Sequence, residues 1–166
     1  MLKFQEIFKF TRGHSELILI LTTVLIFGLL VYFYGVSPKG IYNEGEVIIN
    51  NRHGFKVSLA DTPLKRAKGL SGIKSLSATE GMLFLFDKPA IQYFWMKDML
   101  IPIDIIWISN RRVVGFVENA QPEPDVPTYK LKKYPSPETV DYVLEAKAGT
   151  VRRISLQVGD PVSIRL

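Results

Sequence analysis

The 166-residue chain contains no cysteine and only two histidines, His14 and His53. The absence of cysteine excludes disulfides and thiolate metal ligands, and two histidines are too few for a multi-histidine zinc site and poor material for a Ser-His-Asp triad. The segment Gly69-Leu70-Ser71-Gly72 lacks the spacing and the lysine of a phosphate-binding loop. We therefore expect neither a metal ion nor another cofactor.

Clustered positive charge is also absent. Residues 41–166 carry 17 Lys and Arg against 14 Asp and Glu, a net charge of +3 (17 minus 14), and the two signs are interspersed. A nucleic-acid-binding surface requires a concentrated basic patch. The sequence therefore predicts no nucleic-acid partner.

The N-terminal region contains a long run without charge, Leu17 to Tyr34. At 1.5 Å per residue this run is roughly 27 Å long, close to the hydrocarbon thickness of about 30 Å that a membrane helix crosses. A cleaved signal peptide, the alternative, has a shorter apolar region that ends in small residues, whereas this run ends in bulky aromatics. We therefore predict a retained transmembrane helix that anchors the chain in the membrane.

The basic residues that flank this run predict its orientation. Lys3, Lys9 and Arg12 precede it, and Lys39 alone follows closely. Because Lys and Arg accumulate on the cytoplasmic side, we expect residues 1–16 in the cytoplasm and a single-pass chain in the cell membrane. Residues 35–45 then form a linker, and residues 46–166 form a domain outside the cytoplasm.

Short apolar runs rich in Ile, Val and aromatics, bounded by turn residues, predict that this domain is mainly β. Two helix signals stand among them: Thr62 before Pro63, and Gly149 before Thr150. The expected fold is a small barrel- or sandwich-like domain of seven to nine strands with two short helices. The expected strands are 46–50, 55–60, 81–86, 103–108, 113–117, 142–146 and 162–166.

Asp104 is the main chemical candidate, because it interrupts the apolar run Ile103 to Ile108. A buried carboxylate needs a partner, and Lys97 and Arg66 are the obvious candidates. One interpretation is structural: a buried ion pair, or a carboxylate that caps backbone N–H groups. The other places Asp104 in a functional site with Lys97 and Glu118.

A second candidate feature is the alternation in the segment Tyr93 to Lys97, which puts Tyr93, Trp95 and Lys97 on one side of a strand. Aromatic rings beside a cation suit polar ligands, although core packing explains Trp95 about equally well. The proline-rich stretch from Ala120 to Thr139 contains Tyr129 and Tyr134 and could form a rim over that face.

Several segments stand in one order along the chain: Ala60-Asp61-Thr62-Pro63 with Arg66 and Gly69-Leu70; Gly81-Met82-Leu83-Phe84 with Phe86; Phe94-Trp95-Met96-Lys97; Ile101-Pro102 with Asp104; Glu118-Asn119; Tyr134 with Ser136-Pro137; Val143-Leu144-Glu145 with Ala148-Gly149; and Gly159-Asp160. Together these segments resemble the family of conserved uncharacterised proteins catalogued as domain of unknown function 192. The resemblance covers roughly Phe55 to Leu166 and implies a compact, mostly β domain, often exported or membrane-attached, without an agreed activity. Asp98 stands where the family usually has asparagine, and Met99 where threonine is common.

These features predict a non-catalytic binding or accessory module of the cell envelope, with an envelope glycan or a protein as its partner. The alternative is an envelope glycan hydrolase that uses Asp104 and Glu118 as acid and base, with Lys97 stabilising negative charge. Asp61 and Arg66 are secondary candidates, more typical of a helix cap and a surface charge. The candidate ligand-binding residues are Tyr93, Trp95, Lys97, Asp98, Asp104, Glu118, Asn119 and Tyr134.

Overall fold

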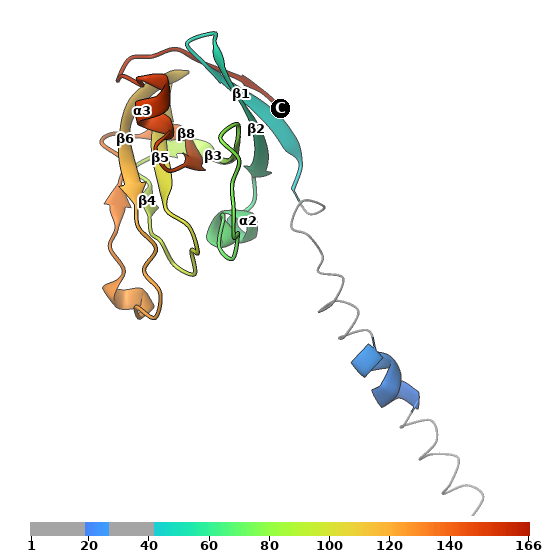
Figure 1. Ribbon diagram of the computed structural model, residues 1–166. Coiled ribbons are helices and arrows are strands. Elements are labelled where there is room, and N and C mark those ends of the chain that lie inside the picture. Colours follow the sequence, from blue (N-terminus) through green and yellow to red (C-terminus); the bar gives the residue numbers. More distant parts are fainter. Residues whose placement is uncertain (1–18, 27–41) are drawn as a thin grey trace, which may run out of the picture. The chain divides into compact units, whose positions relative to one another are not determined.

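A computed structural model describes residues 19–26 and 42–166, which belong to two separate units of the chain (Figure 1). Residues 19–26 are helical. Within the described residues, no helix is both long enough and apolar enough to cross a membrane. Apart from residues 19–26, the membrane helix predicted for Leu17 to Tyr34 lies outside the described residues, as does the flank 1–16.

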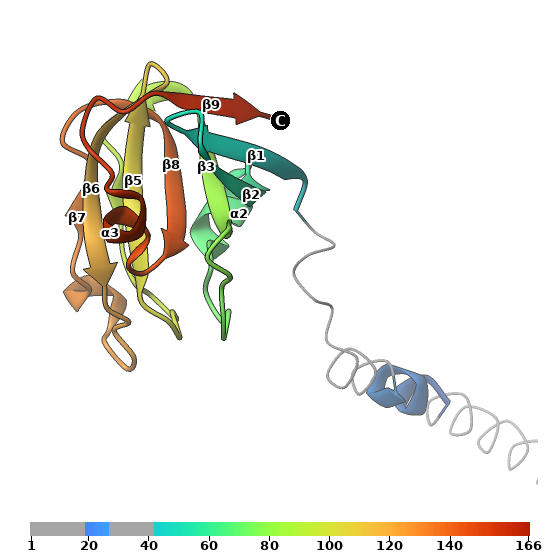
Figure 2. The same cartoon turned by 45° about the horizontal axis from the view of Figure 1, so that its top comes forward.

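Residues 42–166 form a mainly β domain, which confirms the predicted class. Its described part contains nine strands and two short α-helices, α2 (Pro63–Lys68) and α3 (Thr150–Ile154). Seven strands form one sheet that curls into a half-barrel (Figure 2). Their spatial order is β6 (Arg112–Ala120), β5 (Ile103–Ser109), β8 (Val140–Lys147), β3 (Glu80–Ala90), β2 (His53–Ala60), β1 (Glu44–Ile49) and β9 (Val162–Arg165).

Two tight hairpins are encoded by their turn residues. The β1–β2 turn contains Asn50 and Asn51 at φ 56° and 51°, and the β5–β6 turn contains Asn110 and Arg111 at 49° and 58°. Asparagine tolerates these left-handed conformations better than most residues, and paired positive φ angles match the twist of adjacent strands. The turn residues alone therefore predict both hairpins.

The two outer strands of the sheet approach each other at one end. Arg112, at the start of β6, forms an isolated bridge with Pro161, just before β9. The N–H of Val113 donates to the carbonyl of Asp160 at 3.0 Å, and the N–H of Gly159 donates to the carbonyl of Val113 at 2.7 Å. These contacts close the half-barrel at this end.

Each face of the sheet carries a core. On one face, Ile106 and Leu144 pack with Val151 and Ile154 of α3, which lies in front of β5 in Figure 2. On the opposite face, the ring of Phe94 lies edge-on to two other rings, with centroid distances of 4.8 Å to Phe84 and 5.3 Å to Trp107. Strand β5 contributes to both cores, so all seven of its residues are buried.

A second, two-stranded sheet and a short 3-10 helix complete the domain. Strand β4 (Tyr93–Phe94) pairs with β7 (Tyr134–Pro135), and η2 (Thr128–Lys130) lies in the loop before β7. The proline-rich stretch is therefore partly ordered by a strand pair with the segment that follows β3.

Two local predictions were wrong. Asp87-Lys88-Pro89 does not stop β3, which continues past an irregularity to pair Ala90 with Val140. Leu64, Ala67 and Leu70 predict an apolar stripe on the first helix, but α2 buries none of its residues and Leu64 is 83% exposed. Of the three, Leu70 alone is buried, and it follows the end of the helix. This helix is fixed by its caps rather than by apolar burial, which leaves one of its sides available to the site below.

Candidate functional site

A cleft of about 300 Å³ opens between α2, with the residues that follow it, and the segment 92–99. We call it the aromatic cleft. Residues of β3 and β8 form its base. Beneath the base lies the core that contains Phe84, Phe94 and Trp107. Its lining combines aromatic rings with three cations, Arg66, Lys68 and Lys97.

The first wall is α2, a helix of six residues set by its sequence. The hydroxyl of Thr62 accepts the N–H of Lys65 at 3.3 Å, and Pro63 occupies the first turn. Gly69 ends the helix at φ 50°, a left-handed angle that favours glycine. The predicted helix start is therefore confirmed.

Arg66 is held at the cleft by two contacts. Its guanidinium group donates to the carbonyl of Leu85 at 2.8 Å and lies 5.4 Å from the centre of the Phe86 ring. Such contacts fix the orientation of a flexible cation. Arg66, a secondary candidate in the sequence, is a wall residue of the site.

The second wall is the segment 92–99, in which burial alternates. Phe94 and Met96 are buried, whereas Tyr93, Trp95 and Lys97 are exposed and line the cleft. The predicted common side for these three residues is confirmed, although only Tyr93 and Phe94 are in a strand.

Three backbone contacts position this second wall. Gln92 and Ser136 exchange hydrogen bonds, with Gln92 N–H donating to the Ser136 hydroxyl at 3.0 Å and Ser136 N–H donating to the Gln92 carbonyl at 2.8 Å. The Ser71 hydroxyl donates to the Lys97 carbonyl at 2.9 Å, which ties the two walls together.

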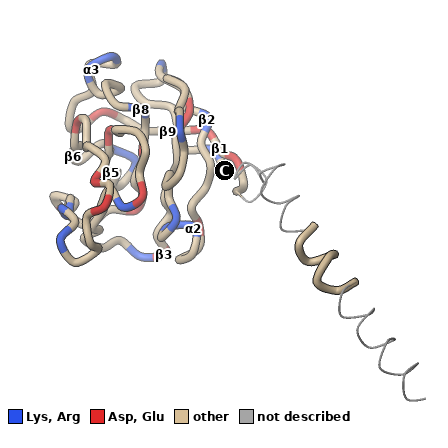
Figure 3. The backbone as a smooth tube through the Cα atoms, turned by 60° about the horizontal axis from the view of Figure 1, so that its bottom comes forward, with Lys and Arg blue, Asp and Glu red and all other residues tan. Residues whose placement is uncertain are grey.

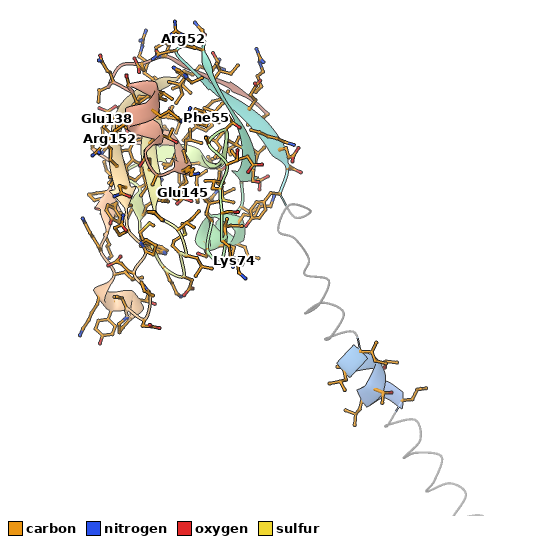
Figure 4. The ribbon with its side chains drawn as sticks, viewed as in Figure 1. Arg52, Phe55, Lys74, Glu138, Glu145 and Arg152 are labelled. Atoms are coloured by element: carbon orange, nitrogen blue, oxygen red, sulfur yellow. The ribbon has the colours of Figure 1, made fainter. Side chains whose placement is uncertain are left out.

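Glu145 lies at the base of the cleft, on β8, and is only 5% exposed (Figure 4). Its Oε2 atom has no hydrogen-bond partner among the residues that the structure describes. Burial raises the pKa of Glu145 to about 8, and a hydrogen bond from the backbone of Leu70 opposes this shift. The ordinary pKa of a glutamate is 4.5. Because the raised pKa lies above 7, this carboxyl group is mainly protonated at pH 7.

Gly69 allows the chain to pass close to this carboxyl group. A Cβ at position 69 would lie 3.4 Å from the Phe84 ring and 3.7 Å from Glu145 Oε2. Gly69 therefore has two roles. It ends α2, and it allows the first wall to lie close to the base of the cleft.

Glu145 was missed as a candidate, although its segment was part of the family resemblance. The available signal was the one that identified Asp104: a single carboxyl group among apolar residues of a strand, here Tyr142 to Ala146. The position of its side chain at the base of a cleft depends on the pairing of β8 with β3, which the sequence does not reveal.

Asp104 is fully buried and caps backbone N–H groups. One oxygen accepts from Asn119 at 2.8 Å and from Gly149 at 3.2 Å, and the other accepts from Val151 at 2.8 Å. The expected partners Lys97 and Arg66 are therefore wrong, because Asp104 faces the start of α3 rather than the cleft. The structural interpretation, a carboxylate that caps N–H groups, describes this residue.

Glu118 and Asn119 lie at the end of β6, beside Asp104 rather than at the cleft. Glu118 accepts a hydrogen bond of 2.7 Å from Arg152. Asn119 has a positive φ of 52°, and its side-chain oxygen accepts from Gln121 at 2.8 Å. The structure therefore separates the predicted candidates into a group at the cleft and a group near α3.

Two further candidates, Asp98 and Asp61, do not line the cleft. Asp98 is exposed at φ 55°, and its carbonyl accepts the N–H of Gly72 at 3.0 Å. Asp61 pairs with Lys65 at 2.7 Å, and this hydrogen bond lowers the pKa of Asp61. Both residues therefore have local structural contacts.

The proline-rich loop was expected to form a rim, but the residues that line the cleft come from other segments. Tyr134 is buried, with Lys132 4.7 Å from its ring centre, and Tyr129 is 83% exposed. The loop instead supports the second wall through the β4–β7 pair. Across the described residues, no group of three or more His, Asp or Glu side chains is placed to hold a metal ion.

Comparison with known families and structures places the domain among proteins without an assigned activity. The model of the domain of unknown function 192 family, described as "Uncharacterized ACR", matches residues 46–164. A UPF0127 protein of Thermococcus kodakarensis is 34% identical over 112 residues, covering 67% of this chain and 65% of the relative, slightly under two thirds of its length. A UPF0127 protein of Thermococcus gammatolerans is 31% identical, with 67% of both chains covered.

Two crystal structures share the fold. One is a Sinorhizobium meliloti 1021 protein, provisionally described as a transcription regulator, with a TM-score of 0.66 and 31% identity; the match covers 74% of this chain and 94% of that protein. The other is a Novosphingobium aromaticivorans protein of unknown function, with a TM-score of 0.64 and 34% identity, over 74% and 84% of the two chains.

Proposed function

This chain belongs to the domain of unknown function 192 family, whose description assigns no activity, and we propose that it is a non-catalytic module that binds a small ligand in the aromatic cleft. One observation carries the proposal. Glu145 presents an unpartnered carboxyl oxygen, almost completely buried, at the base of a cleft lined by aromatic rings.

A buried polar atom without a hydrogen bond is costly, and native structures contain few of them. Where such an atom lies at the base of an apolar cleft, a ligand that supplies the missing hydrogen bond gains affinity by doing so. Small-ligand sites typically combine apolar walls with a few convergent polar groups. The cleft has this composition, with Tyr93, Trp95 and Phe86 beside Arg66 and Lys97.

The hydrolase alternative receives no support from the predicted pair of carboxylates. Both oxygens of Asp104 accept backbone N–H groups, and the side chain has no exposed surface with which to contact a glycan. Glu118 is engaged by Arg152. General acid–base catalysis needs a group within hydrogen-bond reach of its substrate, which buried Asp104 is not placed to provide.

The cellular setting is part of the same proposal. The uncharged run Leu17 to Tyr34 and the basic residues before it support a membrane anchor with the domain facing the cell envelope. An envelope glycan fragment or a partner protein would then be the source of the ligand. Added protease should digest the domain in intact spheroplasts; digestion only after lysis would contradict this orientation.

The provisional description of the Sinorhizobium meliloti protein as a transcription regulator gives little reason to propose nucleic-acid binding here. Residues 41–166 intersperse 14 acidic residues among 17 basic ones. The small ligand remains the function that the described residues support best.

A thermal-shift screen of the full chain in detergent tests the proposal, with a library of small-molecule fragments at 1 mM. A ligand that binds only the folded state raises the unfolding temperature, by RT ln(1 + [L]/Kd) in free energy. Ala67→Phe fills the cleft from α2 and should abolish the shift. Ala78→Phe, a change at an exposed alanine outside the cleft, should preserve it.

Two results would overturn the proposal. One is the absence of any fragment that shifts the unfolding temperature. The other is a shift of equal size in Ala67→Phe, which would place the bound fragment elsewhere on the chain.

A further inference from the structure

We infer that the ligand of the aromatic cleft is a small organic anion: its apolar, planar body lies against the aromatic side chains, its anionic group meets the cations of the walls, and an acceptor oxygen meets the carboxyl group of Glu145. This inference rests on the proposed function and specifies the ligand class.

The charges that line the cleft favour an anion. Arg66 and Lys68 come from α2, where Figure 3 shows basic residues in blue, and Lys97 comes from the opposite wall. Glu145 is the only acid among the described residues that line the cleft. Three cations against one acid attract an anionic group and oppose the entry of a cation.

The apolar part of the ligand is indicated by the rings. Phe84 and Phe86 of β3 line the base, and Trp95 lines the second wall with 42% of its surface exposed. Ring faces give a planar ligand large contact area. A volume of about 300 Å³ lies at the lower end of the usual range for ligand pockets, which limits the body to about one ring.

Glu145 determines which polar group can occupy the base. Because burial raises its pKa to about 8, it is mainly a neutral acid at pH 7 and can donate one O–H hydrogen bond. An anion favours this protonated form, whereas a cationic ligand would favour the ionised form. The two ligand classes therefore predict opposite pH dependences of affinity.

Other titratable or charged groups that face the cleft can also make the affinity depend on pH, and their contribution has to be separated from that of Glu145. They are Arg66 and Lys68 on α2, and Tyr93 and Lys97 on the second wall, while β3 contributes only uncharged lining residues. Replacing Glu145 by glutamine keeps a neutral hydrogen-bond donor and removes its titration. Any pH dependence that survives in Glu145→Gln then belongs to the other groups.

Three probes with one ring and different charges test the inference on the full chain: phenylacetate as the anion, 2-phenylethanol as the neutral compound and 2-phenylethylamine as the cation. Proton NMR titration at pH 7 measures each affinity. For ligands of about ten non-hydrogen atoms we expect dissociation constants on the order of 1 mM. Phenylacetate should bind at least about tenfold more tightly than the amine.

The pH series and the variants sharpen the test. If the anion binds only protonated Glu145, its dissociation constant should rise roughly tenfold between pH 7 and pH 9, and this rise should vanish in Glu145→Gln. Lys97→Gln should weaken phenylacetate several-fold without affecting 2-phenylethanol. Lys74→Gln, at an exposed lysine that does not line the cleft, should change neither.

The possible failures are distinguishable. If 2-phenylethylamine binds best, or if affinity for phenylacetate rises with pH, the ligand class is wrong while the cleft remains a binding site. If none of the probes binds and the fragment screen also finds no ligand, the proposed function fails together with the inference.

Discussion

Replacing Glu145 by glutamine should remove a loss of stability that the unchanged chain undergoes as the pH rises. Glu145 has a pKa of about 8 in the folded chain and an ordinary value of 4.5. Between these values the folded chain holds a proton that the unfolded chain has released. The stability associated with this group is therefore complete below about pH 4.5 and is lost as pH rises towards 8.

The size of the effect follows from the difference between the two values. Each pH unit between them lowers the free energy of unfolding by up to about 1.4 kcal/mol. From pH 4.5 to pH 7 the loss amounts to about 3 kcal/mol, a substantial part of the stability of a typical domain. Because glutamine does not titrate, Glu145→Gln escapes this loss.

Urea denaturation at pH 4.5, 6 and 7 measures the difference in the free energy of unfolding between Glu145→Gln and the unchanged chain. Using this difference cancels the titration of the other groups. The glutamine amide adds an offset of its own, but the offset does not change with pH. We expect the difference to grow by about 3 kcal/mol across the series.

Glu145→Asp is the matched control, because it keeps a titratable carboxyl group at the same position and should retain most of the pH dependence. A difference between Glu145→Gln and the unchanged chain that stays constant from pH 4.5 to pH 7 would refute the reasoning. Such a result would mean that water reaches the carboxyl group and that burial does not govern its protonation.

Three further substitutions test the remaining contacts. Asp104→Asn replaces one carboxylate oxygen with a donor that faces a backbone N–H, and should lower the free energy of unfolding in urea by about 2–4 kcal/mol. Lys97→Ala should change this free energy by less than about 1 kcal/mol, because the side chain is exposed; a loss of about 3–5 kcal/mol would contradict this exposed position. Gly81→Ala places a Cβ 2.6 Å from the carbonyl oxygen of Glu145 and should cost about 1–3 kcal/mol, whereas Gly54→Ala, with its nearest contact at 3.5 Å, should cost clearly less.

The parts of the fold that were predicted are those set by neighbouring residues. The turns at Asn50 and Asn110 identify their hairpins, and Thr62 with Pro63 identifies the start of α2. These signals act over a few residues, so they can be recognised without knowing which strands are adjacent. The length of β3 was not recognised, because its extension to Ala90 depends on pairing with Val140.

The candidate site was predicted only in part, because its walls and base come from distant segments. The alternation of Tyr93, Trp95 and Lys97 is local and identified one wall. The requirement that buried Asp104 be paired was also correct, but its partners include the N–H groups of Gly149 and Val151, which α3 brings to it. Glu145 carries the same sequence signal as Asp104. The strand pattern does not reveal that its Oε2 atom has no hydrogen-bond partner among the described residues, or that its side chain lies at the base of the cleft.

The position of β1 also bears on how the domain is made. One edge of β1 pairs with β2 across a short turn. The other edge pairs with β9, the last strand to be synthesised, and in this pair Glu46 lies opposite Arg165. At about 5–20 residues per second, synthesis leaves that edge without its neighbour for about 6–25 s. An uncovered strand edge invites pairing with other chains, and charged side chains disfavour it. Glu44 and Glu46 on β1 supply such charges. They therefore disfavour pairing of the nascent β1–β2 hairpin with other chains until β9 has been synthesised.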